Sequence, residues 1–316
     1  MHKHPTRRAI VGALASAPLA AGPLAAWAQQ QPIRIIVPYP AGGATDMLGR
    51  LVATHVQSAW NTNVVVENKP GASGTIGGDM VAKAAPDGLT VLMSIVALVQ
   101  LPWMTSKVPF DPQKDLVPVI EVARSSSMLC VPSSMPVKDL KEFIALMKAN
   151  PGKHSFGSYG IGTSAHIQGS LLNMQAGLDL VHVPYKGSAP LVTDMLGGQL
   201  SSAFTHPPTP TPHMKTGKIR VLAVTGSRRN QVVPEVMTMA EHGYKDFEPY
   251  GWFGMFMPAG TPRDVVAKFN AEAARALHAP EATARIQALG LSVVGNSPQE
   301  FERTVRDDAA LYGRII

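Results

Sequence analysis

A chain of 316 residues, of which 45% are hydrophobic, is long enough for two α/β lobes and too apolar for a disordered protein. Its formal net charge of +6 falls to +3 once the three cations of the first 28 residues are set aside, and so small and scattered a charge argues against nucleic-acid binding. The single cysteine, Cys130, excludes an internal disulfide and, between apolar neighbours, is expected to be a buried strand residue.

The first 28 residues have the features of a signal peptide. Lys3, Arg7 and Arg8 form a positive start, an apolar run follows, and Ala26-Trp27-Ala28 supplies a cleavage site. Glycines and prolines interrupt the apolar run, so it is too short for a membrane anchor. We expect export to the periplasm and a mature chain that begins at Gln29. Whether export follows the Sec or the twin-arginine route stays open.

Beyond the leader, short apolar segments alternate with segments of helical periodicity along most of the chain. This alternation is typical of parallel sheets covered by helices on both faces, so we predict an α/β fold. The predicted strands are Ile33–Val37, Val64–Glu67, Thr90–Ile95, Met128–Val131, His154–Gly157, Leu180–Val183, Leu200–Phe204 and Arg220–Thr225.

Several helices can be placed from their periodicity and their start signals. Helical periodicity covers Val137–Ala149 and Ala165–Ala176. Two further helices are expected near the C-terminus, one after Thr261-Pro262 and one at Ser297-Pro298-Gln299-Glu300, which has the form of a capping box. The proline-rich segment His206–Pro212 is expected to form neither a regular helix nor a strand, and its role stays open.

Two predicted strands run through glycines directly into helices. The first strand leads to Gly42 and Gly43, and the strand His154–Gly157 leads to a second glycine-containing segment. A helix that starts in this way leaves backbone N–H groups without partners, which suits an anion. Ligands of open α/β sheets bind where strands give way to helices, so Ala41–Asp46 and Ser158–Ser164 are candidate anion sites.

A series of motifs resembles, in the same order, those of the periplasmic solute-binding receptors of tripartite tricarboxylate transporters, the Bug-type receptors. The resemblance covers the chain from Ile33 to near its end. The motifs are P-x-x-x-G-G-x-x-D at Pro38–Asp46, V-V-V-E-N-K-P-G at Val64–Gly71, G-S-x-G-x-G-[ST]-x-x-H at Gly157–His166, H-V-P-Y-K-G at His182–Gly187, P-H-[IL]-x-x-G-K-[LI]-R-x-L-A-V-T at Pro212–Thr225, and Trp252-Phe253-Gly254 with Pro258–Pro262.

The resemblance implies a type II periplasmic binding protein with two lobes of mixed, mostly parallel sheets and a ligand cleft between them. Lobe 1 is expected to span residues 29–124 and 251–316, and lobe 2 residues 125–250. The implied function is capture of a small organic anion, a mono- or dicarboxylate, by lobe closure, for uptake through a membrane transporter pair. We expect a monomer without cofactor, metal or catalytic residue. The identity of the solute cannot be read from the sequence.

In this family, loop amides, hydroxyls and bound waters hold the solute carboxylate, which implies a set of candidate ligand-binding residues. They belong to the glycine-containing segments, to the H-V-P-Y-K-G motif and to the ends of two further strands. The candidates are Tyr39, Ala41, Gly42, Gly43, Ala44, Asp46, Ser94, Ser158, Gly160, Gly162, Thr163, Ser164, His166, Tyr185, Lys186, Gly187 and Thr205.

Some of these candidates have a second interpretation. Asp46 either reaches the solute through water or caps its own loop, because a carboxylate repels an anion. His166 either contacts the solute or braces its loop, and Lys186 either pairs with a distal carboxylate or lies on the surface. The apolar segment Val96–Trp103 either narrows the solute pocket or packs in the core.

Two other functions stay open at this point. A receptor that binds a solute to inform a signalling partner would share every feature above. A hydrolase is less favoured, because Gly71–Thr75 fails the G-x-S-x-G motif at its last position, although Ser158, His166 and Asp46 could assemble as a triad. The histidines lack metal-ligand spacing, and the glycines match neither the phosphate-loop nor the dinucleotide-binding motif.

Overall fold

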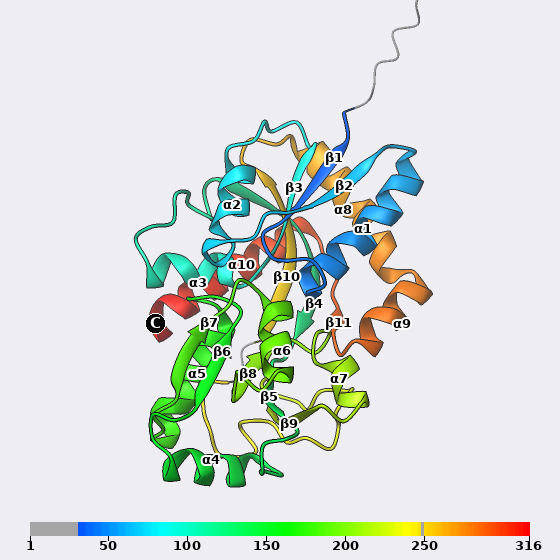
Figure 1. Cartoon of the computed structure of the whole chain (residues 1–316). Helices are drawn as coiled ribbons and strands as arrows, with labels where there is room; N and C mark the ends of the chain where they lie inside the picture. The colour runs from blue at the N-terminus through cyan, green and yellow to red at the C-terminus, as the bar shows by residue number, and fades with distance from the viewer. Residues whose placement is uncertain (1–30, 248–249) are drawn as a thin grey trace, which may run out of the picture. The chain divides into compact units, whose positions relative to one another are not determined.

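The computed structural model describes residues 31–247 and 250–316. The predicted signal peptide, residues 1–28, lies outside the described residues. The described chain forms two sheets, each covered by helices, and these are the two lobes of the predicted α/β fold (Figure 1). We call the lobe built on the six-stranded sheet the first lobe and the lobe built on the five-stranded sheet the second lobe.

The six-stranded sheet has the order β11-β4-β10-β3-β1-β2. Its parallel part is β1 with its neighbours β2 and β3, while β4, β10 and β11 pair antiparallel. The strands are β1 Ile33–Val37, β2 Val64–Asn68, β3 Thr90–Ile95, β4 Leu116–Ser125, β10 Gly251–Pro258 and β11 Ser292–Val293.

The five-stranded sheet has the order β7-β6-β8-β5-β9. Strand β6 pairs in parallel with β7 and β8, and β5 pairs antiparallel with β8 and β9. Both sheets are therefore mixed as predicted, but antiparallel pairing has a larger share than expected. The strands are β5 Met128–Pro132, β6 Ser155–Ser158, β7 Val181–Pro184, β8 Ser202–Thr205 and β9 Ile219–Val224.

The chain passes between the two sheets twice. Strand β4 ends at Ser125 in the first lobe and β5 begins at Met128 in the second. The chain returns between β9 and β10, which begins at Gly251. The lobe boundaries at residues 124 and 250 stay a prediction.

The strands that the pattern did not predict are β4, β10 and β11. Strand β10 carries Gly251 and Gly254, and glycine within a strand weakens the sequence signal. The fold requires Gly254, because a Cβ there would lie 2.1 Å from the ring of Phe301. Strand β4 contains Pro118 and Glu121, which obscure its apolar character.

Helices cover both faces of each sheet (Figure 1). The predicted helices at Val137–Ala149 and Ala165–Ala176 are confirmed, with small shifts at their starts. The helices are α1 Ala44–Trp60, η1 Ala72–Gly74, α2 Thr75–Ala82, α3 Ala97–Met104, α4 Leu140–Ala149, α5 Ser164–Ala176, α6 Ser188–Leu196, α7 Thr211–Lys215, α8 Arg263–His278, α9 Pro280–Ala288 and α10 Pro298–Ile315.

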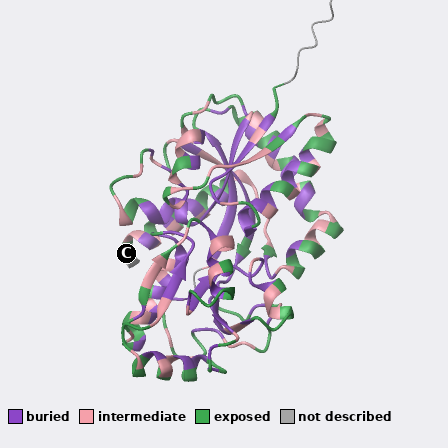
Figure 2. Cartoon of the chain, in the orientation of Figure 1, coloured by how far each residue is buried: buried purple, intermediate pink, exposed green. Residues whose placement is uncertain are grey.

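Alternating side chains of β1 show why this strand is apolar apart from Arg34. Ile35 packs into a cluster with Leu48 of α1 and Phe269 of α8. Ile36 points to the opposite face, into a cluster with Phe301 of α10. Both faces of the strand are therefore buried, as Figure 2 shows for the centre of the sheet.

The second lobe is built in the same way around β5. Leu129 shares a buried cluster with Phe143 of α4, and Cys130 on the opposite face shares one with Leu191 and Met195 of α6. Cys130 is fully buried, which confirms its prediction as a buried strand residue, and burial raises the pKa of its thiol.

Of the predictions made from capping residues and prolines, one is confirmed by the structure and one is partly wrong. The capping box at Ser297 is confirmed, since its Oγ accepts from the Glu300 N–H at 3.3 Å while Glu300 Oε2 accepts from the Ser297 N–H at 2.9 Å. The prediction for the proline-rich segment is wrong at its end, because α7 includes Thr211 and Pro212. A proline in the first turn of a helix loses no hydrogen bond, since that N–H has no helical partner.

Trp252 lies where β10 enters the first sheet. Its ring is 1% exposed, and its Nε1–H donates to Asp308 Oδ2 at 2.8 Å. Burial raises the pKa of the Asp308 carboxyl to about 6. The indole is thus fixed between the return crossing and α10.

Candidate functional site

The first glycine loop, residues 38–43, connects β1 to α1. Gly42 has a φ of +83°, a conformation that favours glycine, and Gly43 is the extended N-cap of α1. No side chain caps the helix, although its first residues, Ala44 and Thr45, are buried. The first turn of α1 therefore keeps backbone N–H groups that an anion can use.

Asp46 is turned back onto this loop. Its carboxylate accepts from the Gly42 N–H at 3.1 Å, from Arg50 Nε at 3.0 Å and from Asn68 Nδ2 at 3.0 Å. Asn68 also donates to the carbonyl of Tyr39, so the end of β2 clamps both sides of the loop. Of the two interpretations of Asp46, this geometry matches the loop brace.

The brace of the first loop is ionic. Burial of Asp46 opposes its ionisation, but the hydrogen bonds from Arg50, Gly42 and Asn68 outweigh burial and hold its pKa below the usual value. Asp46 is therefore ionised throughout the physiological pH range, and its charge is balanced by Arg50.

The second glycine loop, residues 159–163, connects β6 to α5. Ser158 Oγ donates to the Gly160 carbonyl at 3.0 Å, and Thr163 Oγ1 donates to the same carbonyl at 2.7 Å. Gly160 and Gly162 have φ values of +147° and +75°. Because the hydroxyl of Thr163 is turned to the loop, no side chain caps α5.

Two histidines brace this second loop. His182 Nε2 lies 2.8 Å from Ser158 Oγ, and the His182 ring stacks between His166, at 4.1 Å, and Phe156, at 4.9 Å. His166 Nδ1 accepts from the Gly162 N–H at 3.3 Å. Of the two interpretations of His166, this contact matches the loop brace.

Both histidines of the brace are neutral near pH 7. Burial, and then the neighbouring His166, lowers the pKa of His182 to about 4. Burial also lowers the pKa of His166. Protonation of His166 at Nδ1 would remove the acceptor for the Gly162 N–H, so the brace requires the neutral form.

The third loop, residues 185–187, precedes α6. Tyr185 Oη donates to Asp194 Oδ2 at 3.0 Å, and Lys186 is exposed. Gly187, the N-cap of α6, lies so close to the first lobe that a Cβ there would be 2.6 Å from Pro40 Cδ. Like α1 and α5, α6 begins without a side-chain cap.

The lobes meet through these loops. A Cβ on Gly43 would lie 3.7 Å from Ser188 Oγ at the start of α6. A Cβ on Gly160 would lie 2.7 Å from Ser73 Oγ, and one on Gly162 would lie 2.7 Å from the Leu101 side chain. The starts of α1, α5 and α6 thus all lie where the two lobes touch.

Neutral polar groups are buried beside the second loop. Tyr159 Oη lies 3.0 Å from His206 Nε2, and burial lowers the pKa of His206 to about 4. Thr205 Oγ1 and His206 Nδ1 are buried without a partner. Ser94, also buried, lies on β3 opposite Gly254. Unsatisfied buried atoms indicate a place for water or solute.

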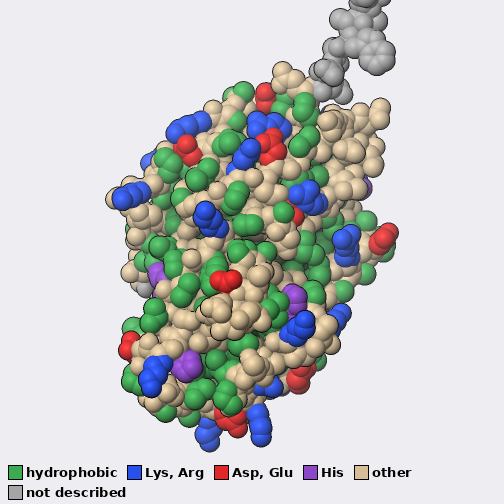
Figure 3. Space-filling model, in the orientation of Figure 1, with side chains coloured by type: hydrophobic (Ala, Val, Ile, Leu, Met, Phe, Trp, Pro, Cys, Tyr) green, Lys and Arg blue, Asp and Glu red, His purple; other side chains and the backbone are tan. Residues whose placement is uncertain are grey.

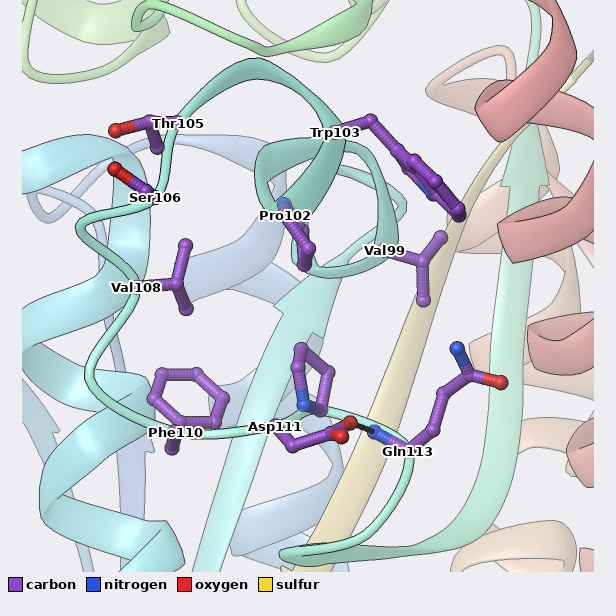
Figure 4. A pocket seen from close by; sticks show the side chains of 10 residues that line it. Val99, Pro102, Trp103, Thr105, Ser106, Val108, Phe110, Asp111 and Gln113 are labelled. Carbon is purple, nitrogen blue, oxygen red and sulfur yellow. Dashed lines mark hydrogen bonds between the residues drawn. The ribbon is translucent and has the colours of Figure 1, made fainter.

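The apolar segment Val96–Trp103 has two faces. Gln100 and Leu101 face the second glycine loop. Val99, Pro102 and Trp103 instead line a cavity of about 330 Å³ closed by the loop through Phe110 and Asp111 (Figure 4). Trp103 is 53% exposed there. None of the candidate ligand-binding residues lines this cavity.

A hydrolytic triad is not assembled among the described residues. Ser158 is near His182, not His166, and Asp46 is bound to Arg50, Asn68 and Gly42 rather than to a histidine. The described residues also contain no cluster of three or more metal-ligating side chains. On the face shown in Figure 3, cations and anions are intermixed.

Several residues of this region were missed by the candidate set. Asn68 and His182 both lie within recognised motifs, and these motif positions could have indicated that both residues belong to the site region. Gln100 is the single polar residue of the otherwise apolar α3, and an isolated polar residue in an apolar segment could have indicated a buried polar contact. Tyr159 occupies a variable position of the Gly157–His166 motif and His206 begins the proline-rich segment, so the sequence marked their segments but neither side chain.

Comparison with known proteins identifies the family. The family described as "Tripartite tricarboxylate transporter family receptor" (TctC) matches residues 37–316. Among solved structures, Rpa4515 of R. palustris with adipate is similar at a TM-score of 0.87 and 30% identity, over 90% of this chain and 95% of that chain. MatC from Rhodopseudomonas palustris with bound malate has a TM-score of 0.84 and 28% identity, over 90% and 98%.

A third structure differs more in arrangement at a similar identity. It is a TctC solute binding protein from Polaromonas with no ligand, with a TM-score of 0.65 and 27% identity, over 90% of this chain and 97% of that chain.

No helix in the part of the chain that the structure describes is long and apolar enough to span a membrane.

Proposed function

Because the chain belongs to the tripartite tricarboxylate transporter receptor family, we propose that it captures a small mono- or dicarboxylate between its lobes for uptake by a tripartite tricarboxylate-type transporter. Receptors of this family are periplasmic binding proteins, so the chain is a receptor and not an enzyme. Cleavage of the signal peptide after Ala28 and a monomeric mature protein are part of the same proposal.

The observation that carries the proposal is the position of three helix starts. Helices α1, α5 and α6 begin without side-chain caps, and their starts lie where the lobes touch. Each start carries about half a unit of positive charge and free N–H groups, which favour an anion. The candidate amides are those of Ala44, Ser164 and Ser188 and their helix neighbours.

The similar structures support a carboxylate as the solute. Two relatives of similar fold hold adipate and malate. The loops here offer amides and hydroxyls, while the nearest cations have other roles or positions: Arg50 is paired with Asp46, and Lys186 is exposed. A carboxylate bound by neutral donors needs no side-chain cation, since charge-assisted hydrogen bonds to N–H groups are strong.

A thermal-shift panel tests the proposal. Mature protein is mixed with acetate, succinate, malate, adipate and benzoate, and with glucose and choline as uncharged and cationic controls that lack a carboxylate. A ligand present at a hundred times its Kd adds about 2.7 kcal/mol to the free energy of unfolding. At roughly 2–4 °C per kcal/mol, the shift is several degrees.

Calorimetry and mass spectrometry complete the test. We expect at least one carboxylate to bind with one-to-one stoichiometry and to be recovered unchanged after long incubation. Binding of glucose or choline alone, or turnover of the bound carboxylate, would contradict the proposed function. N-terminal sequencing of protein from the periplasm should begin at Gln29.

A further inference from the structure

Gln100 is a buried amide in an apolar helix. Its side chain is 0% exposed on α3, whose other buried residues, among them Leu98 and Leu101, are apolar. A buried amide without partners would destabilise the fold by its full desolvation cost. Gln100 Nε2 donates to Ser164 Oγ at 3.1 Å, and Gln100 Oε1 lies 3.4 Å from the same hydroxyl.

The contact between Gln100 and Ser164 joins the two lobes. Helix α3 packs against α10 in the first lobe, and α5 packs against β6 and β8 in the second. Around the contact, Gly162 fits against Leu101, and Ile167 of α5 packs on the apolar cluster of the first lobe. The hydrogen bond is therefore enclosed by apolar contacts that form only when α5 lies against α3.

The hydroxyl of Ser164 is turned to the first lobe. Ser164 is buried, and its Oγ lies within hydrogen-bond distance of both the amide nitrogen and the amide oxygen of Gln100. A serine hydroxyl can donate one hydrogen bond and accept two, so Gln100 can use it in either direction. The backbone N–H of Ser164, at the start of α5, is the group left for a solute.

We propose that Gln100 is a positioning residue that latches the closed receptor, because its amide holds Ser164, and with it the solute-binding start of α5, against the first lobe. This inference rests on the proposed function and assigns the Ser164 hydroxyl to closure. The latch forms whenever the lobes close, with or without a solute, and a bound solute keeps them closed. Loss of the latch therefore speeds solute departure and leaves the rate of entry into the open form unchanged.

The first test separates the two rates. Gln100→Leu removes the amide at similar size in an apolar helix, and stopped-flow binding uses the carboxylate that binds best in the panel. We expect the dissociation rate to rise about tenfold, with the association rate unchanged, since most contact losses act on dissociation. A slower association with an unchanged dissociation rate would overturn the proposal.

A double-mutant cycle tests the partner. Gln100→Leu and Ser164→Ala should each speed dissociation, and the double variant should be no faster than the faster single variant. Effects that multiply would show that the two side chains act independently and would overturn the latch.

Gln100→Glu supplies a reversible break of the same contact. Its carboxylate lacks the donor and adds a charge at a buried position, and burial raises the pKa of a carboxyl. Dissociation should therefore be fast at pH 7.5 and slow again toward pH 5, where the protonated acid resembles the amide. Gln113→Glu adds the same charge at an exposed position of the same lobe and should change neither rate. An effect of the control equal to that of Gln100→Glu would overturn the proposal.

A further measurement needs no ligand. Amide hydrogen exchange at residues 167–169, the first hydrogen-bonded turn of α5, should be several-fold faster in free Gln100→Leu than in the free wild type. Equal exchange in the two proteins would overturn the latch. If the wild type bound no carboxylate of the panel, the proposed function would be refuted, but the exchange measurement would still test the latch.

Discussion

The two glycine loops have the same geometry and are held by different forces. Each follows a parallel strand, turns through a glycine with positive φ and starts a helix without a side-chain cap. The loop after β1 is held by the ionised Asp46 with Arg50 and Asn68. The loop after β6 is held by the neutral pair His166 and His182.

This difference shows that the helix start, and not the brace, is the common requirement. A charged brace keeps its strength in mild acid but weakens in salt, whereas a histidine brace resists salt and fails when it is protonated. Among the helices away from these loops, α4 and α10 are capped by Asp139 and Ser297, whereas α8 and α9 also begin without a side-chain cap.

The largest effect is expected from a charge at the start of α1. Gly43→Asp has an allowed φ of −81° and room for a Cβ, so the protein should fold with an unchanged or higher melting temperature, since aspartate is a good N-cap. Its carboxylate would occupy the N–H groups and repel the solute. We expect calorimetry to show at least about a hundredfold loss of affinity, or about 2.7 kcal/mol.

Gly43→Asn is the matched control for this change. Asparagine has the same shape and also caps helices, but it carries no charge. It should lose clearly less affinity than Gly43→Asp. Equal losses would mean that space, not charge, matters at this position.

The second loop should lose stability when its hydroxyl is removed. Ser158→Ala breaks the bond to the Gly160 carbonyl and leaves His182 Nε2 without its partner. We expect the free energy of unfolding in urea to fall by about 1–3 kcal/mol. Ser170→Ala, an exposed site on α5, should change it by less than about 0.5 kcal/mol.

The pH dependence should distinguish the two braces. The folded pKa of His182, about 4, lies below its unfolded value of 6.5, so its contribution to stability is full above pH 6.5 and is lost as the pH falls toward 4. The pKa of Asp46 is lowered from 3.8, so its contribution is lost only below that pH. Of the two loops, only the second should therefore weaken between pH 6.5 and pH 4.

Melting curves at several pH values measure this difference. His182→Gln should lose less stability between pH 6.5 and 4 than the wild type does. His206, whose pKa is also about 4, should keep its own share of the pH dependence in both proteins. An identical decline in the two proteins would contradict the assigned role of His182.

The smallest effect concerns the salt bridge of the first loop. Arg50 is half exposed, and Asp46 keeps its bonds to Gly42 and Asn68 without it. Arg50→Ala should therefore reduce the free energy of unfolding by about 0.2–1 kcal/mol, and 0.5 M salt should shrink the difference. A larger, salt-independent loss would show that Arg50 contributes by packing.

Much of the fold could be predicted because local pattern and global structure agree. Strands β1 and β3 were predicted at their observed bounds, since both faces of each are largely buried and most of their positions are apolar. The crossing strand β10 was not among the pattern-based strands, because Gly254 is fixed by the distant Phe301. No local pattern reports such a contact.

The same limit applies to the candidate site. The glycine loops were found because a strand, glycines and a helix follow one another in sequence. The bond between Gln100 and Ser164 spans 64 positions, and the stack of His182 on His166 depends on the register of β7 beside β6. Contacts of this kind belong to the folded chain, so sequence motifs could indicate the residues but not their partners.

The position of Trp252 gives the protein an optical reporter. Its indole is buried at the return crossing and donates to Asp308, while Trp60 and Trp103 lie nearer the surface. Indole emission responds to the field of a nearby carboxylate and to small changes in its hydrogen bond. Movement of one lobe about the crossings should therefore change the fluorescence of the unlabelled protein, and Asp308→Asn should alter the size of that change.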